Sequence, residues 1–310
     1  MRCFRSCYAS GVKPHRASVT ARFVAACRGL GSLLPDSARL VEDPFGARVL
    51  GGALASAVGA LARAPMPLRL LVWAPLWPML PWTLYMQVRT RVLDDALRVF
   101  VARGGRQLVI LGAGFDARGW RLQSDLRGAT VFEVDHPATH AAKRALFGDD
   151  GAVRALAWDF ECEGTRALPE RLASIGHDAA EPSFTIWEGV TMYLTPEAFD
   201  STLDAVQRYS AAGSGLAFNY VERSLIDRPS IPARVVATVV RAVGEPFKLG
   251  FAPDELCERL AKKGFRVHED RELSDIAGEL LGERWRAVAA SGRRFALVER
   301  TATAEVPRDR

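Results

Sequence analysis

Hydrophobic positions in the first hundred residues recur at the spacing of helices. Apolar side chains three or four positions apart predict helices over residues 17–30, about 46–63 and 89–102. A helix of this kind packs one face against a core and leaves the opposite face in water. The pattern therefore predicts a helical region that precedes any strand.

After residue 102 the pattern changes to short apolar runs that alternate with helical segments. The first run, QLVIL, is followed directly by glycines, which is typical of a buried strand in a parallel sheet. Further runs of similar length follow along the chain. The predicted strands are residues 107–111, 130–134, 153–157, 184–187, 215–220 and 294–298.

Helix-start and helix-stop signals fall between these runs. Thr195 is a good N-cap, and Pro196 stands at the first helical position. Pro253 opens a later helix that Gly264 is placed to end. Strands that alternate with helices predict an α/β fold with a Rossmann-like, doubly wound and mainly parallel sheet under an N-terminal helical cover.

Domain boundaries follow from the same patterns, and no internal repeat is visible. We expect a single domain because one sheet and its helices account for almost the whole length. The predicted parts are a basic, disordered extension over 1–16, the helical cover over 17–102, the Rossmann-like core over 103–300 with a helical insert near 225–263, and a tail over 301–310.

Composition and charge narrow the class of protein. Of the 310 residues, 49% are hydrophobic and 25% are charged, which excludes disorder, collagen and coiled coil for the chain as a whole. The net charge of +5 comes from residues 1–35, which hold six basic residues and no acid. Residues 36–310 hold 35 basic and 36 acidic residues, so the body lacks the basic excess of a nucleic-acid-binding protein.

The cysteines indicate a reducing compartment. The chain has five, an odd number, and only Cys3 and Cys7 lie close together. Since no second pair follows them, we predict reduced thiols, no zinc site and a cytoplasmic location. The chain also shows no Ser/His/Asp constellation and no pattern of metal ligands. The first 16 residues lack the apolar core of a secretory signal peptide. They are basic and contain no acid, which is also the composition of a mitochondrial presequence.

One apolar stretch, residues 70–88, holds no charge over 19 positions. That length is just enough to span a bilayer. Prolines recur within it, and each removes a backbone donor that a single helix in lipid could not replace. We therefore predict no membrane span but a buried or pocket-covering segment, with contact to a membrane or partner surface as the alternative. Its tryptophans and prolines are Trp73, Trp77, Trp82, Pro75, Pro78 and Pro81.

The sharpest local motif is the glycine turn that follows the first predicted strand. Gly112 to Ala117 reads GAGFDA and fits the pattern G-x-G-x-x-G/A. Asp135 ends the second strand, where a carboxylate can accept hydrogen bonds from both ribose hydroxyls, and Asp159 follows the third. Together these features predict an adenosine site. From spacing alone, NAD(P) and S-adenosylmethionine both remain possible ligands.

Four longer segments carry a family resemblance. They are VRTRVLDD at 88–95, VILGAGFDARGWRL at 109–122, VFEVDHPATHAAKR at 131–144 and FTIWEGVTMYLTPE at 184–197. Together they resemble the leucine carboxyl methyltransferase-like family of S-adenosylmethionine-dependent methyltransferases, and most closely its bacterial branch of polyketide O-methyltransferases. The resemblance runs from about residue 17 to 300.

The resemblance implies roles toward the cofactor S-adenosylmethionine and its product S-adenosylhomocysteine. Arg89 would bind the methionine carboxylate, Asp135 would hold the ribose, and Glu188 would contact the cofactor from the fourth strand end. The remaining cofactor residues would be Gly112 and Gly114 beneath the methionine part, Asp116 in the same turn, and Asp159 and Phe160 at the adenine.

The resemblance also implies where the reaction takes place. Tyr193 lies on the turn at which the family has its reaction centre, and with Glu188 it is our candidate catalytic residue. Trp187, Tyr193 and Tyr220 are candidates to line the substrate pocket, where aromatic faces can stabilise the sulfonium cation. A carboxylate acceptor needs no general base, whereas a phenol would benefit from one. His136, His140 and Glu188 are the candidate bases.

Several functions remain open at this point. We expect O-methylation of a carboxylate or hydroxyl of a small hydrophobic metabolite, without nucleic acid as a partner and with no prediction of the oligomeric state. A protein C-terminal carboxyl methyltransferase is the alternative within the class. An NAD(P)-dependent oxidoreductase and a noncatalytic adenosine-binding protein are alternatives from other classes.

Overall fold

The computed structural model describes residues 18–148, 151, 153–160, 164–228, 246–288 and 292–301. The predicted extension over 1–16, part of the helical insert near 225–263, nearly all of the tail over 301–310, and Cys3, Cys7 and Cys162 lie outside the described residues. Cys27 and Cys257, which are described, form no disulfide.

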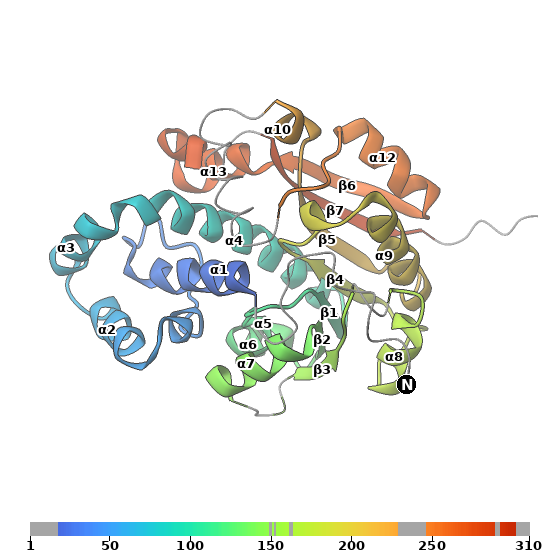
Figure 1. Ribbon diagram of the computed structural model, residues 1–310, viewed down its shortest axis with the longest axis horizontal. Helices are drawn as coiled ribbons and strands as arrows, with labels where there is room; N and C mark the ends of the chain where they lie inside the picture. Colours follow the sequence, from blue (N-terminus) through green and yellow to red (C-terminus); the bar gives the residue numbers. More distant parts are fainter. Residues whose placement is uncertain are drawn as a thin grey trace, which may run out of the picture.

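A seven-stranded sheet organises the chain (Figure 1). Its order is β3-β2-β1-β4-β5-β7-β6; the first five strands along the chain run parallel, and β7 is antiparallel to both of its neighbours. This confirms the predicted α/β, mainly parallel sheet. The strands are β1 Gln107–Leu111, β2 Thr130–Asp135, β3 Val153–Ala157, β4 Ser183–Trp187, β5 Gly215–Val221, β6 Phe265–Glu272 and β7 Arg293–Arg300.

Strand β6 was not predicted. Its sequence, FRVHEDRE, is dominated by charged residues, and only Phe265 in it is fully buried. Its one partner is β7, so it forms the edge of the sheet, where charged side chains reach water. An edge strand of this kind lacks the apolar run that marks the strands inside the sheet.

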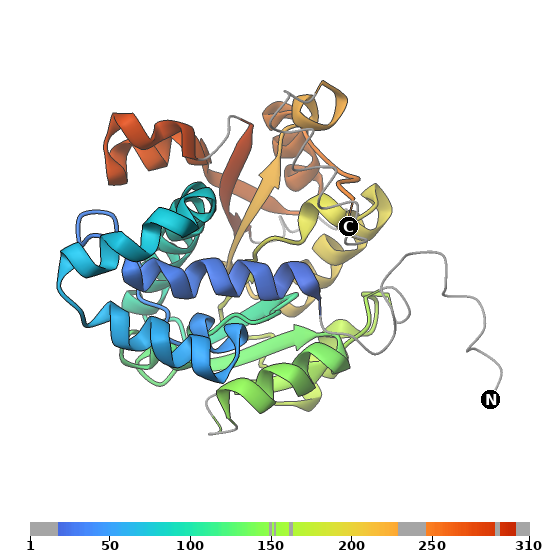
Figure 2. The ribbon, with the colours of Figure 1, turned by 60° about the vertical axis from the view of Figure 1, so that its left-hand side comes forward.

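The N-terminal region forms the predicted helical cover. Helices α1 to α4, blue to cyan, group at one side of the sheet in two views (Figures 1 and 2). Helix α4 begins nine residues before the predicted start because Pro81 falls in its first turn, where a missing N–H costs nothing. The elements are α1 Val19–Leu30, η1 Gly31–Leu33, η2 Gly46–Leu50, α2 Gly52–Ala62, α3 Met66–Leu76, η3 Trp77–Met79 and α4 Leu80–Ala102.

The remaining helices connect the strands. Thr195 caps α9 by accepting a hydrogen bond from the Ala198 amide, with Pro196 at the first position, as predicted. These helices are α5 Arg118–Arg121, α6 Gln123–Leu126, α7 Pro137–Phe147, α8 Leu168–Ser174, η4 Thr191–Tyr193, α9 Pro196–Tyr209, α10 Arg223–Asp227, α12 Pro253–Lys262, α13 Leu273–Leu281 and η5 Glu283–Val288.

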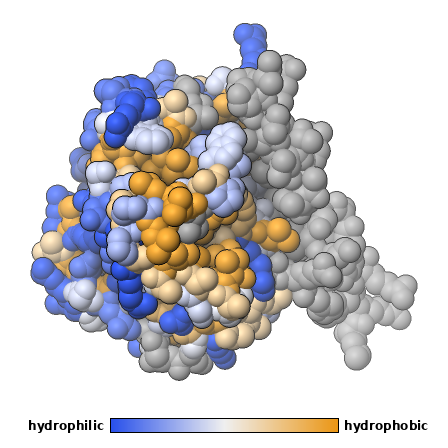
Figure 3. All heavy atoms as spheres, turned by 90° about the vertical axis from the view of Figure 1, so that its left-hand side faces the viewer, coloured by the Kyte–Doolittle hydropathy of each residue, from blue (hydrophilic) through white to orange (hydrophobic). Residues whose placement is uncertain are grey.

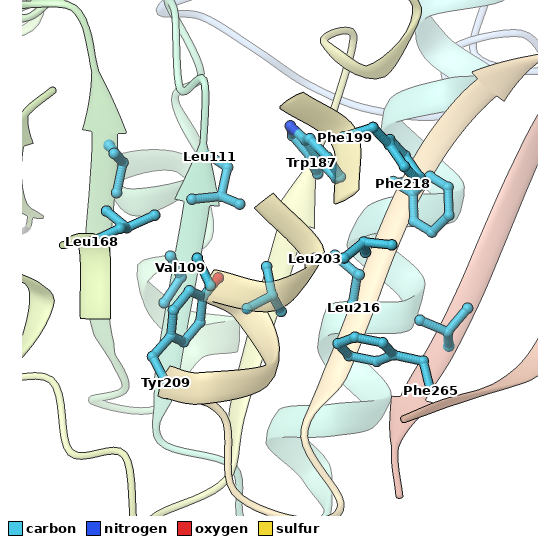
Figure 4. Close-up of a cluster of buried hydrophobic side chains, with 14 of the residues drawn as sticks. Val109, Leu111, Leu168, Trp187, Phe199, Leu203, Tyr209, Leu216, Phe218 and Phe265 are labelled. Carbon is cyan, nitrogen blue, oxygen red and sulfur yellow. The ribbon is translucent and has the colours of Figure 1, made fainter. Parts of the chain in front are cut away.

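Two hydrophobic clusters cover the two faces of the sheet. Val109 and Leu111 of β1 pack with residues of α8, α9 and α12 on one face (Figure 4). Leu108 and Ile110 pack with residues of α4 and α13 on the other. Because successive strand residues point to opposite faces, an all-apolar strand is buried on both sides. The sheet is therefore a rigid support for the loops at its strand ends.

The apolar stretch over 70–88 divides between the inside and the outside of the cover. Trp73 is buried, Trp82 is half-buried and Trp77 is exposed. The prediction of a buried segment thus holds for only part of the stretch. None of the helices in the described part of the chain is both long and apolar enough to cross a membrane.

A buried ion pair between β2 and α7 makes the stability of the fold depend on pH. Glu133 Oε2 accepts a hydrogen bond from Lys143 Nζ over 2.6 Å, and both side chains are almost completely buried. Burial raises the pKa of Glu133 to about 7, although Lys143 acts in the opposite direction. The folded protein therefore binds this proton more tightly than the unfolded chain does.

We expect the wild type to lose stability relative to Glu133→Gln as the pH rises from 5 to 8. Glu133 stabilises the fold fully below its unfolded pKa of 4.5, and this contribution is lost as the pH rises through about 7. The loss is on the order of 3 kcal/mol. Urea unfolding of both proteins at pH 5 and 8 measures it, and parallel pH profiles would contradict the assignment.

Candidate active site

A cavity of about 300 Å³ opens where the carboxyl ends of β1, β2 and β4 meet. Its other walls come from α1, from Arg89 of α4, and from the segment around Lys248. Ligands of open α/β sheets bind at this edge, where the strand order reverses. The order places the reversal between β1 and β4. The fold thus brings together side chains that are far apart in the sequence.

The glycine turn after β1 forms the floor of this cavity. Gly112 has a φ of 65° and Gly114 a φ of 51°, a region that other residues seldom adopt. A Cβ atom on Gly112 would lie 2.6 Å from Val190 Cγ2, and one on Gly114 would lie 3.1 Å from Ala21 Cβ. The turn therefore needs glycine both for its conformation and for its close packing against the loop after β4 and against α1.

Asp135 is held against the same turn. Its Oδ2 accepts a hydrogen bond from the Gly114 amide over 2.5 Å, and its Oδ1 accepts one from the His136 amide over 2.6 Å. The carboxylate lines the cavity and is half-buried. A carboxylate fixed in this way can accept hydrogen bonds from hydroxyl groups of a ligand.

The two candidate histidines make local contacts. His136 Nδ1 accepts a hydrogen bond from the Ala138 amide and caps α7, while His140 Nε2 lies 3.1 Å from the Leu156 carbonyl oxygen. Neither belongs to the described lining of the cavity. Asp159 is likewise outside that lining, with its Oδ2 3.9 Å from His136 Nε2, whereas Phe160 lines the cavity.

Glu188 lies between two arginines at the end of β4. Its Oε1 accepts a hydrogen bond from Arg89 Nε over 2.8 Å, and its Oε2 accepts one from Arg118 Nη1 over 2.6 Å. Burial by itself would raise the pKa of Glu188, but the charges of Arg118 and Arg89 outweigh it and hold this pKa well below its usual range. Glu188 is therefore ionised at neutral pH and is unsuited to accept a proton, which argues against it as a general base.

Arg118 connects three parts of the site. Its guanidinium is fully buried and pairs with Asp94 of α4 over 2.7 Å, with Asp116 of the glycine turn, and with Glu188. Arg121 adds a second, bidentate pair to Asp94 over 2.6 and 2.8 Å. The charges beneath the cavity are thus fixed by their neighbours before any ligand binds.

Sequence reasoning missed Arg118 and Asp94. Both lie inside the segments that carry the family resemblance, VRTRVLDD and VILGAGFDARGWRL, so a signal was present. It missed Arg28 as well, which lines the cavity, pairs with Asp43 over 3.0 Å and donates to the Phe115 carbonyl oxygen over 2.7 Å. Charged residues next to a motif are normally surface residues, and only the fold shows that these are buried.

The three aromatic candidates divide between cavity and core. Tyr193 of η4 lines the cavity, and its ring lies 5.7 Å from that of Phe247. Trp187 stacks on Phe199 in the core, and the Tyr220 hydroxyl donates to Asp270 Oδ2 over 2.8 Å. Both are almost completely buried and neither is in the described lining, so the structure does not place them in a substrate pocket. Trp187 of β4 and Tyr220 of β5 belong to the hydrophobic cluster between the sheet and its helices, whereas Tyr193 lies in the loop beyond the strand end.

No group of His, Cys, Asp and Glu side chains among the described residues could hold a metal ion. The carboxylates and arginines of the cavity suit an organic ligand that carries both hydroxyls and charges. Asp135 offers acceptors at one strand end, and the Arg89 guanidinium lies against the turn at Gly189. Hydroxyls and a carboxylate would find complementary partners at these two positions.

Comparison with known proteins adds an independent result. Residues 21–207 match the family model of leucine carboxyl methyltransferase. A protein of Mycolicibacterium gilvum (strain PYR-GCK), provisionally assigned as an S-adenosyl-L-methionine-dependent methyltransferase, is 35% identical over 231 residues, 73% of this chain and 72% of the relative. A protein of Streptomyces coelicolor with the same assignment is 36% identical over 208 residues, 64% of each chain.

Solved structures of similar fold cover nearly the whole chain. A protein of Thermobifida fusca YX, provisionally assigned as a methyltransferase, aligns with a TM-score of 0.55 and 18% identity over 93% of this chain and 96% of its own. A DUF574 family protein of Streptomyces avermitilis aligns with a TM-score of 0.58 and 15% identity over 93% and 99%. At these identities the likeness is one of fold.

Proposed function

This chain belongs to the leucine carboxyl methyltransferase family of S-adenosylmethionine-dependent methyltransferases, and we propose that it methylates a carboxylate oxygen of a small hydrophobic acid. One observation supports the carboxylate most directly. The described lining of the cavity contains no histidine, and its carboxylates are engaged with arginines or backbone amides. An acceptor that is already ionised at neutral pH needs no base from the protein.

The residues of the cavity fit the cofactor. We assign Arg89 to the methionine carboxylate, Asp135 to the ribose hydroxyls and Phe160 to the adenine, above a floor formed by Gly112 and Gly114. The place of both glycines in the cavity lining supports this assignment, because a turn without side chains presents its backbone to a ligand. Asp116 and Glu188 supply the negative charge for the methionine amine. Asp159 would reach the adenine from the edge of the site.

The protein contributes binding and orientation to the transfer. When bound, the cofactor supplies a methyl group on a sulfonium, which is already an activated electrophile. Glu188 fixes the direction of the Arg89 guanidinium, and Arg118 fixes Glu188. Such a preorganised set of charges holds the cofactor in one orientation without rearrangement during the reaction, which lowers the entropic cost of the transfer.

Two further residues are suited to the acceptor. Tyr193 lines the cavity beside the segment that carries Lys248, whose backbone amide donates to the Met192 carbonyl oxygen over 2.7 Å. Lys248 brings a positive charge to the exposed side of the cavity, where it attracts an anionic acceptor. We therefore propose Tyr193 as a residue at the reaction centre and Lys248 as a residue that favours carboxylates.

The test combines labelled methyl donor with an extract of the host cells. We expect label in a small, solvent-extractable product that releases methanol in mild alkali, because methyl esters hydrolyse there and methyl ethers do not. Alkali-stable label would show a hydroxyl acceptor instead. Label that stays with protein would favour methylation of a protein C-terminal carboxylate. Both outcomes would overturn the proposed acceptor while leaving the methyltransferase activity intact.

Asp135→Ala is expected to weaken binding of S-adenosylhomocysteine by about 1–3 kcal/mol, because ribose hydroxyls would lose a fixed acceptor. Isothermal calorimetry measures the change. Asp125→Ala on α6 is the matched control, since that carboxylate pairs with Arg98 away from the cavity. Equal affinities of wild type and Asp135→Ala would exclude the ribose assignment.

A further inference from the structure

The outer side of α2 and α3 carries an apolar surface that the proposed function does not use. Five large side chains on it are strongly exposed, and a continuous apolar area is visible on this face of the molecule (Figure 3). We call it the α2–α3 surface. It consists of Leu54 of α2 (54% exposed), of Leu68 (46%), Leu70 (51%) and Leu71 (68%) of α3, and of Trp77 (69%), which begins η3 directly after α3.

Helix α3 is apolar on both of its sides. Trp73 points inward, donates through Nε1 to the Leu33 carbonyl oxygen over 3.2 Å, and packs in a cluster with Leu30 and Leu33. Leu68 and Leu71 lie on the opposite, exposed side. Single exposed leucines are ordinary, but a group of this size on adjacent helices indicates a contact surface.

Charge indicates what this surface contacts. Residues 44–93 contain five arginines and no acidic residue or lysine. Two of these arginines belong to the α2–α3 segment, and only Arg63 is exposed. The Arg69 side chain is 11% exposed, donates to the Leu34 carbonyl oxygen over 3.4 Å and lies 3.9 Å from Asp36 Oδ1. Leucines and a tryptophan beside an exposed arginine, on a segment of the chain that itself contains no acid, suit the boundary of a membrane that carries anionic lipids.

We propose that the α2–α3 surface docks this protein on an anionic lipid surface. The apolar side chains enter the interface, Arg63 meets the headgroups, and the protein remains on one side of the bilayer. A second copy of the chain suits the surface less well. In a twofold dimer through this surface both copies of Arg63 would be enclosed, and the α2–α3 segment contains no acid to pair with them. This inference does not depend on the acceptor proposed above.

Vesicle flotation tests the proposal with the full chain. We expect at least tenfold stronger binding to vesicles of phosphatidylcholine with 30% phosphatidylglycerol than to phosphatidylcholine alone. The double variant Leu71→Glu/Trp77→Glu should lose this binding by at least tenfold. Val99→Glu is the matched control, because Val99 is 50% exposed on α4 outside the surface, and it should bind like the wild type.

Two further measurements make the result decisive. Both variants should keep the wild-type melting temperature and affinity for S-adenosylhomocysteine, since none of the three residues lines the cavity. Equal flotation of wild type and double variant, or no preference for the anionic vesicles, would overturn the proposal. A wild-type dimer in analytical ultracentrifugation that the double variant abolishes would overturn it too, by assigning the surface to a second copy.

Discussion

Arg89→Ala is expected to weaken binding of S-adenosylhomocysteine by about 2–4 kcal/mol, or about 30- to 1000-fold. Arg89 is buried, and its Nε donates to Glu188 while the terminal nitrogens lie against the turn at Gly189. The variant removes the cation for the methionine carboxylate and leaves negative charge in the cavity. The loss therefore combines a missing attraction with a new repulsion. Isothermal calorimetry at neutral pH measures it.

The neighbouring arginine on the same helix provides the control. Arg91 is partly exposed and pairs with Asp95 one turn later, over 2.6 Å. Arg91→Ala should change the affinity by less than about 0.5 kcal/mol, because exposed pairs contribute little and Arg91 does not line the cavity. If both variants bound the ligand as the wild type does, Arg89 would not hold the methionine carboxylate.

Arg118→Met is expected to lower the free energy of unfolding by about 3–5 kcal/mol. The methionine side chain keeps much of the volume but leaves Asp94, Asp116 and Glu188 with fewer positive partners in a buried place. A buried carboxylate without a partner costs far more than a surface one. Urea denaturation at pH 7 measures the loss. Binding of S-adenosylhomocysteine should weaken as well, because Glu188 loses the Arg118 contact that fixes it beside Arg89.

Arg98→Met is the matched control for this substitution. Arg98 pairs with Asp95 and Asp125, but its side chain is 40% exposed. We expect a loss below about 1 kcal/mol, since water screens such pairs. Similar losses for both variants would mean that the burial of Arg118 does not increase its contribution to the free energy of unfolding.

Much of the fold was predictable from the sequence for physical reasons. The strands inside the sheet are apolar on both faces, so their sequence is distinctive, as in QLVIL over 107–111. The edge strand β6 was not predicted because it is partly exposed to water and its sequence therefore has no apolar run. The start of α4 was predicted too late because prolines usually interrupt a helix, although in the first turn they are compatible with one.

The sequence predicted part of the candidate site, but not the protonation states of its residues. The motifs identified Arg89, the glycine turn, Asp135 and Glu188, and the fold places all of them on one cavity. The protonation of Glu188 depends on Arg118 and Arg89, which come from other elements. Its low pKa, which argues against a role as a base, is a property of distances and burial that no local pattern contains.

Apart from the edge strand β6, the sequence alone therefore determined the order of the strands and the residue types at the strand ends, because both depend on local periodicity and turn chemistry. Tertiary structure decided which charged groups are buried together, as around Arg118, and which aromatic residues enter the core, as Trp187 and Tyr220 do. It also decided that one side of α3 stays exposed. Burial and charge pairing arise between segments distant in the sequence, so they are set only when the chain folds.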